Sequence, residues 1–280
     1  MLDVLFLHVI QDAANKSGFH SPPVLDLDSF AEWSPSFMAA QEKNASESVR
    51  KQMAETPPDL LEEALQKLFD LATRENVVAA TLNWIRSKTI AAYHGSRLTD
   101  LEAVSVKTNG LIPLEKSARR VRLKRALSRH RRWSEVADKL DSLIATCAIG
   151  REGRVTLAFS RSALTDDYNH YLTHGSEFDQ CVAEHLLGQE GLDLLAIDGR
   201  RTLIQVAVPG ATALDAANPH RTADEIAAQG EIPQLAKELL EVWSYSLAYP
   251  GSEHRFSISC DMAIVSVPSA WIASIKTFSD

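Results

Sequence analysis

The chain has few cysteines, no long apolar stretch and no repeated or low-complexity segment. Its three cysteines, Cys147, Cys181 and Cys260, lie far apart and form no C-x-x-C pair. A sparse, odd count argues against a disulfide framework and indicates a reducing compartment. No apolar run approaches the roughly 20 residues that span a bilayer. These absences predict a protein that does not engage a membrane.

The amino terminus also lacks a secretion signal. Residues 1–12 are apolar, but no basic residue precedes them, and Asp3 interrupts them. A secretory signal begins with a basic segment, so we expect a cytoplasmic protein. The composition, 45% hydrophobic and 24% charged over 280 residues, is that of an ordinary globular chain able to bury its own core.

Charge is distributed unevenly along the chain. The net charge is −8, yet residues 116–132 hold nine Lys and Arg and no acidic residue. Five of these basic residues step by three and four and would form one stripe along a helix: Arg119, Arg122, Arg125, Arg129 and Arg132. We favour a surface that neutralises the acidic remainder of the chain. The alternative is a phosphate-binding surface for a nucleic-acid acceptor or for a diphosphate.

Hydrophobic periodicity predicts an α+β protein in two parts. Residues 1–88 form a helical N-terminal region, with helical spacing of apolar residues over 58–86. Residues 89–280 alternate between strands and helices, with a helical insert, and few clean βαβ units appear. Strands are expected at 89–95, 154–160, 202–210, 256–267 and 269–278, and helices at 98–111, within 116–146, and at 176–188 and 232–248.

Capping residues mark several of these helices. Asp59 is expected to cap a helix in the N-terminal region. Thr99 or Asp100 would begin the helix after the first long strand, and Asn109-Gly110 would end it. Ser176 would begin a later helix.

Two H-G-S triplets occur, but only His94-Gly95-Ser96 sits at the end of an apolar strand and before a capped helix. This position places an imidazole and a hydroxyl at the tip of a strand. Gly95 has no Cβ, so its backbone N–H and C=O stay open to a ligand.

Residues 91–111, AAYHGSRLTDLEAVSVKTNGL, resemble the first strand and helix of ADP-ribosyltransferases of the diphtheria-toxin and poly(ADP-ribose) polymerase type. The resemblance implies an enzyme with that split-sheet fold, which uses NAD as co-substrate and passes ADP-ribose to an acceptor. His94 and Ser96 would bind a ribose hydroxyl, Gly95 the nicotinamide amide, and Arg97 the diphosphate. Small enzymes resembling this family often act as toxins or phage-defence effectors.

The same resemblance implies a tyrosine that stacks on nicotinamide and a glutamate on a late strand. Tyr171 is the preferred tyrosine and Tyr168 the other candidate. The late strand offers Asp261, which is one methylene shorter than glutamate, and Glu177 is the substitute carboxylate. Such a group would stabilise the oxocarbenium-like charge that forms as nicotinamide leaves.

Other functions remain open at this point. Related chemistry includes NAD hydrolysis and NAD-dependent 2′-phosphate transfer from RNA, and a different class is a catalytically inactive module that binds nucleic acid or protein. A zinc site from His170, His174, Cys181 and His185 is the rival constellation, but Gly175 interrupts the helix it needs, so we expect no metal. A serine hydrolase is disfavoured because the G-x-S-x-G elbow is missing.

Overall fold

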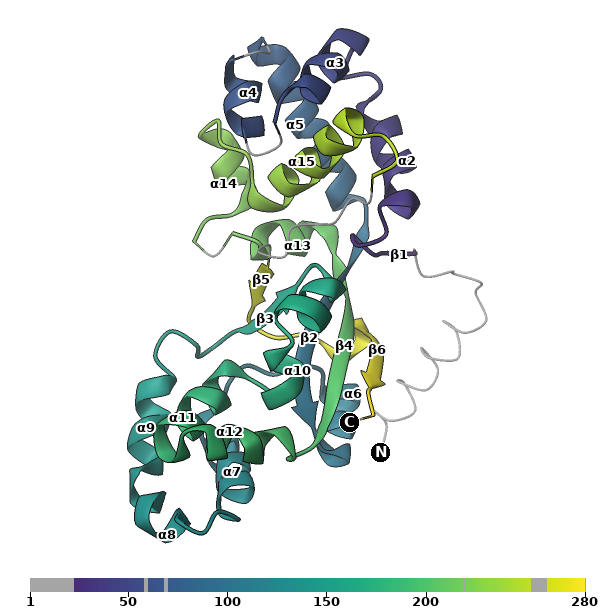
Figure 1. Cartoon of the computed structure of the whole chain (residues 1–280). Helices are drawn as coiled ribbons and strands as arrows, with labels where there is room; N and C mark the ends of the chain where they lie inside the picture. Colours follow the sequence, from purple (N-terminus) through teal and green to yellow (C-terminus); the bar gives the residue numbers. More distant parts are fainter. Residues whose placement is uncertain (1–22, 58–59, 68–69, 219, 253–260, 280) are drawn as a thin grey trace, which may run out of the picture.

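The computed structural model describes residues 23–57, 60–67, 70–218, 220–252 and 261–279. Two groups of helices lie at opposite ends of a central sheet, and two long strands, β2 and β4, run from one group to the other (Figure 1). The mixture of helices with an open, mostly antiparallel sheet agrees with the expected α+β class. None of the described helices is long and apolar enough to cross a membrane.

The sheet is built around one extended antiparallel pair. All ten residues of β2 (Thr89–Leu98) pair with β4 (Arg200–Pro209), from Thr89 opposite Pro209 to Leu98 opposite Arg200. The strand order is β5-β3-β2-β4-β6. The remaining strands are short: β1 (Val24–Leu25), β3 (Val155–Ala158), β5 (Asp261–Ile264) and β6 (Ile272–Thr277).

The second edge of β2 is only partly covered. Strand β1 pairs in parallel with its first two residues, and β3 touches it at one position, Tyr93 opposite Ala158. From His94 to Leu98, no strand within the described residues pairs with this edge. Backbone groups of alternate β2 residues therefore point into the space beside the strand rather than to a neighbouring strand.

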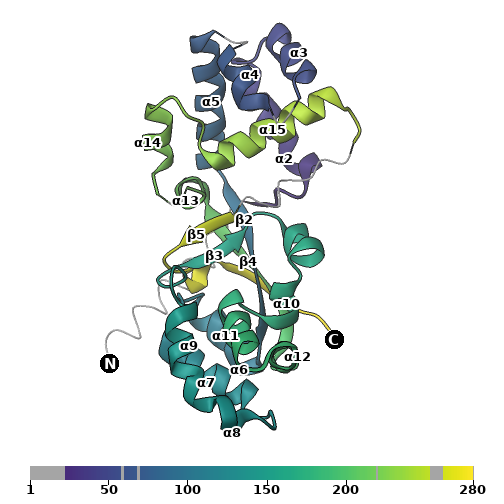
Figure 2. The ribbon, with the colours of Figure 1, turned by 60° about the vertical axis from the view of Figure 1, so that its left-hand side comes forward.

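The first helical group combines helices that precede β2 with helices that follow β4 (Figures 1 and 2). Its members are α2 (Phe30–Gln41), α3 (Glu47–Glu55), α4 (Leu61–Lys67), α5 (Leu71–Arg86), α13 (Gly210–Ala216), α14 (Ala223–Ala228) and α15 (Gln234–Ala248). Phe37 packs edge-on against both Trp84 and Trp243. One hydrophobic core thus joins α2 to α5 with α15 and the sheet.

The second helical group lies at the other end of the sheet and has its own core. It contains α7 (Lys116–Leu127), α8 (Trp133–Val136), α9 (Leu140–Cys147), α11 (Glu177–Leu187) and α12 (Gln189–Ala196). Two further helices, α6 (Asp100–Asn109) and α10 (His170–His174), pack on the sheet: Val106 of α6 belongs to the first core, and Leu172 of α10 to a small cluster with Tyr93 of β2. Leu123 and Leu127 of α7 are fully buried against α9 and α11. The basic helix therefore packs its leucines inward, as its spacing predicts.

Local sequence signals set the helix ends around β2. Thr99 caps α6 in a capping box with Glu102, and Gly110 ends the helix with a φ of 81°. Ser176 caps α11: its hydroxyl oxygen accepts a hydrogen bond from the backbone N–H of Asp179. These predicted caps are confirmed, whereas Asp59 and residues 256–260 of the predicted strand lie outside the described residues.

Gly110 provides a test of this arrangement. A Cβ there would lie 1.9 Å from the Val267 carbonyl oxygen, whereas a Cβ on Gly150, which also has a positive φ, would meet nothing within 4 Å. Both substitutions to alanine carry the cost of a positive φ, roughly 1–3 kcal/mol, and the φ of 81° and ψ of −164° at Gly110 lie in a region that is essentially restricted to glycine. Only Gly110→Ala adds overpacking, worth about 1–3 kcal/mol more. In urea unfolding, Gly110→Ala should therefore lose much more free energy of unfolding than Gly150→Ala. Equal losses of stability in the two variants would contradict the packing at Gly110.

Candidate functional site

A cavity of about 670 Å³ lies beside the uncovered edge of β2. Its volume is within the usual range for small-molecule sites, about 300–1,000 Å³. The walls come from β2, β3, α6, α7 and the segment that runs through α10 into α11. Seven of the residues predicted from the sequence line it together: His94, Gly95, Ser96, Tyr171 and Glu177, with Arg119 and Arg122 of the arginine stripe. The other candidate tyrosine, Tyr168, also lines it.

His94 spans the opening between β2 and β3. Its Nδ1 lies 3.0 Å from the Thr156 carbonyl oxygen. That oxygen can only accept, so Nδ1 carries the proton and Nε2 is left as an acceptor. Burial lowers the pKa of His94, with the nearby Arg119 cation acting in the same direction and the Thr156 bond opposing it. The ring is therefore neutral near pH 7 and offers an acceptor in the cavity wall.

Gly95 allows α10 to approach the strand closely. A Cβ on Gly95 would lie 3.1 Å from the Tyr171 Cβ and 3.4 Å from Leu172 Cδ2. Any larger residue would push α10 away from β2. The glycine thus brings the Tyr171 ring to the strand end that carries His94. A glycine at this position is therefore favoured by packing as well as by the ligand access argued from the sequence.

Glu177 has contacts at both carboxylate oxygens. The Tyr171 hydroxyl donates to its Oε1 at 2.7 Å, and Arg151 Nη2 lies 3.8 Å from its Oε2. His170 Nε2 is 3.9 Å from the same Oε1, and the His170 and Tyr171 rings are 4.3 Å apart. The Glu177 side chain remains half exposed, so the carboxylate is accessible from the cavity.

Arg97 takes a different place from that implied by the family resemblance. Its side chain is buried, and it donates to the carbonyl oxygens of Thr173 (3.4 Å) and Gly199 (2.7 Å). It is not among the residues that line the cavity. The odd-numbered residues of β2 face η3 (Ala163–Asp167) and α10, so Arg97 points to the opposite face of the sheet from His94.

Asp261 is placed only by its backbone. It is the first residue of β5 and lies opposite Ala158 of β3. Ala158 in turn lies opposite Tyr93, and both line the cavity. The strand that carries Asp261 is thus one strand removed from β2, while the Asp261 side chain lies outside the described residues.

A cationic wall that sequence reasoning missed faces these groups. Arg151 and Arg154 line the cavity from the loop between α9 and β3. Arg154 bonds the carbonyl oxygen of Gly150 at 2.7 Å, and Arg151 bonds that of Cys147 at 3.1 Å. The signal was present in the sequence as R-E-G-R directly before a predicted strand. Arg119 and Arg122 of the basic stripe also line the cavity, but they are paired with the buried Asp179, whereas Arg151 and Arg154 lie in a loop.

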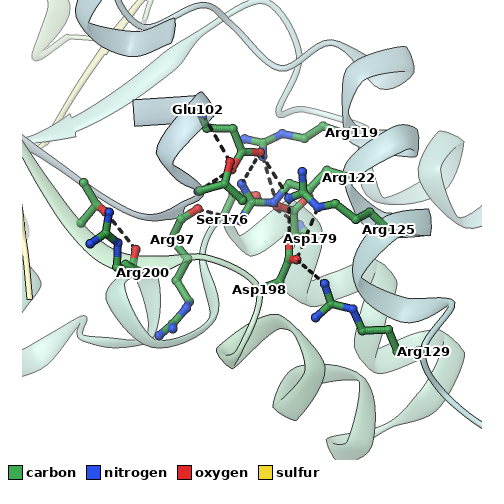
Figure 3. Close-up of polar contacts among 12 residues, drawn as sticks. Arg97, Glu102, Arg119, Arg122, Arg125, Arg129, Ser176, Asp179, Asp198 and Arg200 are labelled. Carbon is green, nitrogen blue, oxygen red and sulfur yellow. Dashed lines mark hydrogen bonds and ion pairs between the residues drawn. The ribbon is translucent and has the colours of Figure 1, made fainter. Parts of the chain in front are cut away.

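The predicted arginine stripe is occupied by acidic residues of this chain (Figure 3). Asp179, whose side chain is 0% exposed, lies 3.1 Å from Arg119 Nη1 and 3.3 Å from Arg122 Nε. Asp198, 3% exposed, lies 2.7 Å from Arg125 and 3.5 Å from Arg129. Arg132 lies 3.5 Å from Glu135. This geometry agrees with the self-neutralising interpretation of the stripe.

Arg122 is the centre of this charge cluster. Its Nη1 donates to Glu102 of α6 at 3.1 Å, and its Nη2 donates to the Arg97 carbonyl oxygen at 2.7 Å. Burial alone would raise the pKa of Glu102, but the Arg122 cation and the Thr99 hydrogen bonds outweigh it and hold that pKa below its ordinary value. The ionised cluster lies between β2, α6 and α11 and lines the cavity through Glu102 and Arg122.

The cysteines correct one expectation from the sequence. Cys147 and Cys181 form a disulfide across 34 residues of sequence, with their Cα atoms 6.2 Å apart. The sparse count gave no warning because the pairing depends on α9 packing beside α11. Among the described residues, Cys147, Cys181 and His185 are also the group whose metal-ligating atoms all lie within 4.8 Å of one another. His170 and His174, which the rival zinc set grouped with Cys181 and His185, are not part of it.

No family model, curated protein or solved structure matches this chain.

The protonation of His94 can be tested directly. Because burial lowers its pKa in the native state, His94 should titrate below about 6.5, the value of an unfolded histidine. The free energy of unfolding should fall as the pH drops below 6.5, because His94 then binds a proton in the unfolded chain but stays neutral in the folded protein. NMR titration of the ring signals, assigned by the spectrum of His94→Asn, measures the midpoint. A midpoint at or above 6.5 would refute the described surroundings of His94.

The buried part of the charge cluster should govern stability. Asp179→Asn leaves Arg119 and Arg122 without their buried carboxylate, which should cost about 3–5 kcal/mol. The matched control is Asp141→Asn, which breaks an ion pair with Arg120 on the same α7, but one in which both side chains are exposed. Exposed pairs contribute little, so this variant should unfold close to wild type. Chemical denaturation measures the free energy of unfolding of both variants. Similar losses in Asp179→Asn and Asp141→Asn would contradict the larger contribution of the buried ion pair.

Proposed function

We propose that the chain is an NAD-dependent ADP-ribosyltransferase, and that NAD binds in the cavity beside β2. The observation that carries the proposal is the meeting of Glu177, hydrogen-bonded to Tyr171, with a neutral His94 in one cavity of suitable size. His94 lies more than 70 residues before Tyr171 and Glu177 in the sequence, and the three side chains differ in chemistry. Their convergence on the uncovered edge of a strand supports a ligand-binding role.

The proposed binding mode follows from what each wall offers. His94 Nε2 accepts from a ribose hydroxyl, with Ser96 on the same face of β2 beside it. The open edge of β2 near Gly95 supplies backbone groups for the nicotinamide amide. Tyr171 stacks on the nicotinamide ring, as aromatic faces favour. We assign the diphosphate to Arg151 and Arg154 in place of Arg97, because the latter is held by backbone carbonyls on the opposite face.

The proposed reaction breaks the bond between the ribose C1′ and the nicotinamide nitrogen. The bonding electron pair leaves with nicotinamide, which becomes neutral, and positive charge develops on the ribose ring. The Glu177 carboxylate stabilises that charge and accepts from a ribose hydroxyl. An acceptor nucleophile then donates an electron pair to C1′ and loses a proton. With water as the acceptor, the same steps amount to NAD hydrolysis.

Glu177 is preferred to Asp261 as the catalytic carboxylate. Glu177 lines the cavity next to the tyrosine, whereas β5, which carries Asp261, lies beyond β3. To bind the ligand, the Glu177 carboxylate must give up its contacts with Tyr171 and Arg151. Both of these partner side chains are accessible from the cavity. A diphosphate bound by Arg151 would draw that guanidinium away and release one carboxylate oxygen.

Purified protein with NAD tests the proposal. Glu177→Gln should lower the rate of nicotinamide release by about 10²–10³-fold with little change in NAD affinity. Glu184→Gln is the matched control, an exposed glutamate further along α11 that does not line the cavity. His94→Ala should weaken NAD binding in calorimetry. Equal NAD binding by His94→Ala and wild type would refute the site, and unchanged turnover in both Glu177→Gln and Asp261→Asn would refute the mechanism.

A further inference from the structure

Cys147, Cys181 and His185 form a compact cluster outside the chemistry proposed above. Cys147 is the last residue of α9, and Cys181 lies in α11 with His185 one turn further along. The two sulfurs are joined, and His185 Nδ1 lies 3.9 Å from Cys181 Sγ. Two thiols and an imidazole at this separation are the parts of a thiol redox site.

The two cysteines of the cluster have unequal surroundings. Cys147 is 3% exposed within the second hydrophobic core, whereas Cys181 is partly exposed and His185 is exposed. His185 Nδ1 also lies 2.7 Å from the Cys181 carbonyl oxygen, which can only accept, so Nδ1 carries a proton. Cys181 is thus the more reachable sulfur, with an imidazole beside it, and Cys147 is the sheltered one.

The disulfide connects the two segments that meet at Glu177. Glu177 and Cys181 are four residues apart on α11 and so lie on one face of that helix. On the other side, the Cys147 carbonyl oxygen accepts from Arg151 at 3.1 Å, and Arg151 reaches to 3.8 Å from Glu177. The cross-link therefore fixes the start of the loop over residues 148–154 relative to the first turn of α11.

We propose that Cys147 and Cys181 are a reversible thiol–disulfide pair, with Cys181 as the site of oxidation, and that their state controls the order of residues 148–154 at the cavity wall. The inference concerns thiol chemistry and the loop, and it holds whether or not the cavity binds NAD.

A peroxide is a sufficient oxidant for this pair. The Cys181 thiolate attacks one peroxide oxygen, the O–O bond breaks, and hydroxide leaves, giving a sulfenic acid. The Cys147 sulfur then attacks the Cys181 sulfur, the S–O bond breaks, and water leaves with the Cys147 proton. A dithiol reductant reverses the change through a mixed disulfide and is itself oxidised.

Thiol trapping on the full-length folded protein tests the chemistry. After reduction with dithiothreitol, iodoacetamide should label Cys181 before Cys147, and hydrogen peroxide should restore the Cys147–Cys181 disulfide, both read by peptide mass spectrometry. Cys147→Ala, which keeps the core apolar, should accumulate a dimedone-reactive sulfenic acid at Cys181. His185→Asn should slow labelling of Cys181 at pH 7 by about tenfold, the change for one pKa unit. Cys260→Ser is the control and should behave as wild type.

Several results would overturn the proposal. Resistance of the folded protein's disulfide to dithiothreitol would make it a structural cross-link, and so would labelling of Cys147 as fast as Cys181. Hydrogen exchange tests the coupling without any ligand: peptides covering 148–154 should exchange faster in the reduced protein, while β2 and β4 stay unchanged. Equal exchange of 148–154 in the two states would refute control of the loop.

Discussion

The buried pairing of Arg122 with Asp179 is the interaction on which the arrangement of the cavity depends. An ionised side chain removed from water is tolerated only when it is paired and hydrogen-bonded, so these two groups must meet. Arg122 also holds Glu102 and the Arg97 carbonyl oxygen. One guanidinium therefore fixes the end of β2, the start of α6 and the first turn of α11 around a common point (Figure 3). Three of the cavity walls begin at these places.

The same interaction explains why a strongly basic helix does not imply a polyanionic partner. Buried Asp179 and Asp198 are paired with several cations. Arg119, Arg122 and Arg125 are three residues apart on α7, and Arg129 follows the end of that helix at Leu127. Arg151 and Arg154, in the loop between α9 and β3, line the cavity, as do Arg119 and Arg122 of the stripe. Arg151 lies 3.8 Å from the half-exposed Glu177, whereas Arg119 and Arg122 are held by the fully buried Asp179.

What the sequence predicts well is local. Thr99, Gly110 and Ser176 act through backbone groups a few residues away, so their effects follow from the chain itself. Tyr171 and Glu177 are six residues apart, with a helix end and a cap between them, and the same local geometry brings them together. The strand predicted at 89–95 and the helix predicted at 98–111 could be found for the same reason. By contrast, the side of the sheet to which Arg97 points depends on which helices cover each face, and no pattern within β2 encodes that.

Features that depend on distant packing could not be predicted in this way. The disulfide requires α9 and α11 to lie together, and the N-terminal helices require α15, which follows them by about 150 residues of chain. In both cases the apolar spacing predicts that a helix is buried but not which partner buries it, because hydrophobic contact is non-directional. The charged contacts are more selective. Asp179 is a buried, charged residue of α11, and a buried carboxylate is stable only when it is paired or hydrogen-bonded. The basic helix α7 supplies two arginines to it, because Arg119 and Arg122 are three residues apart on one face.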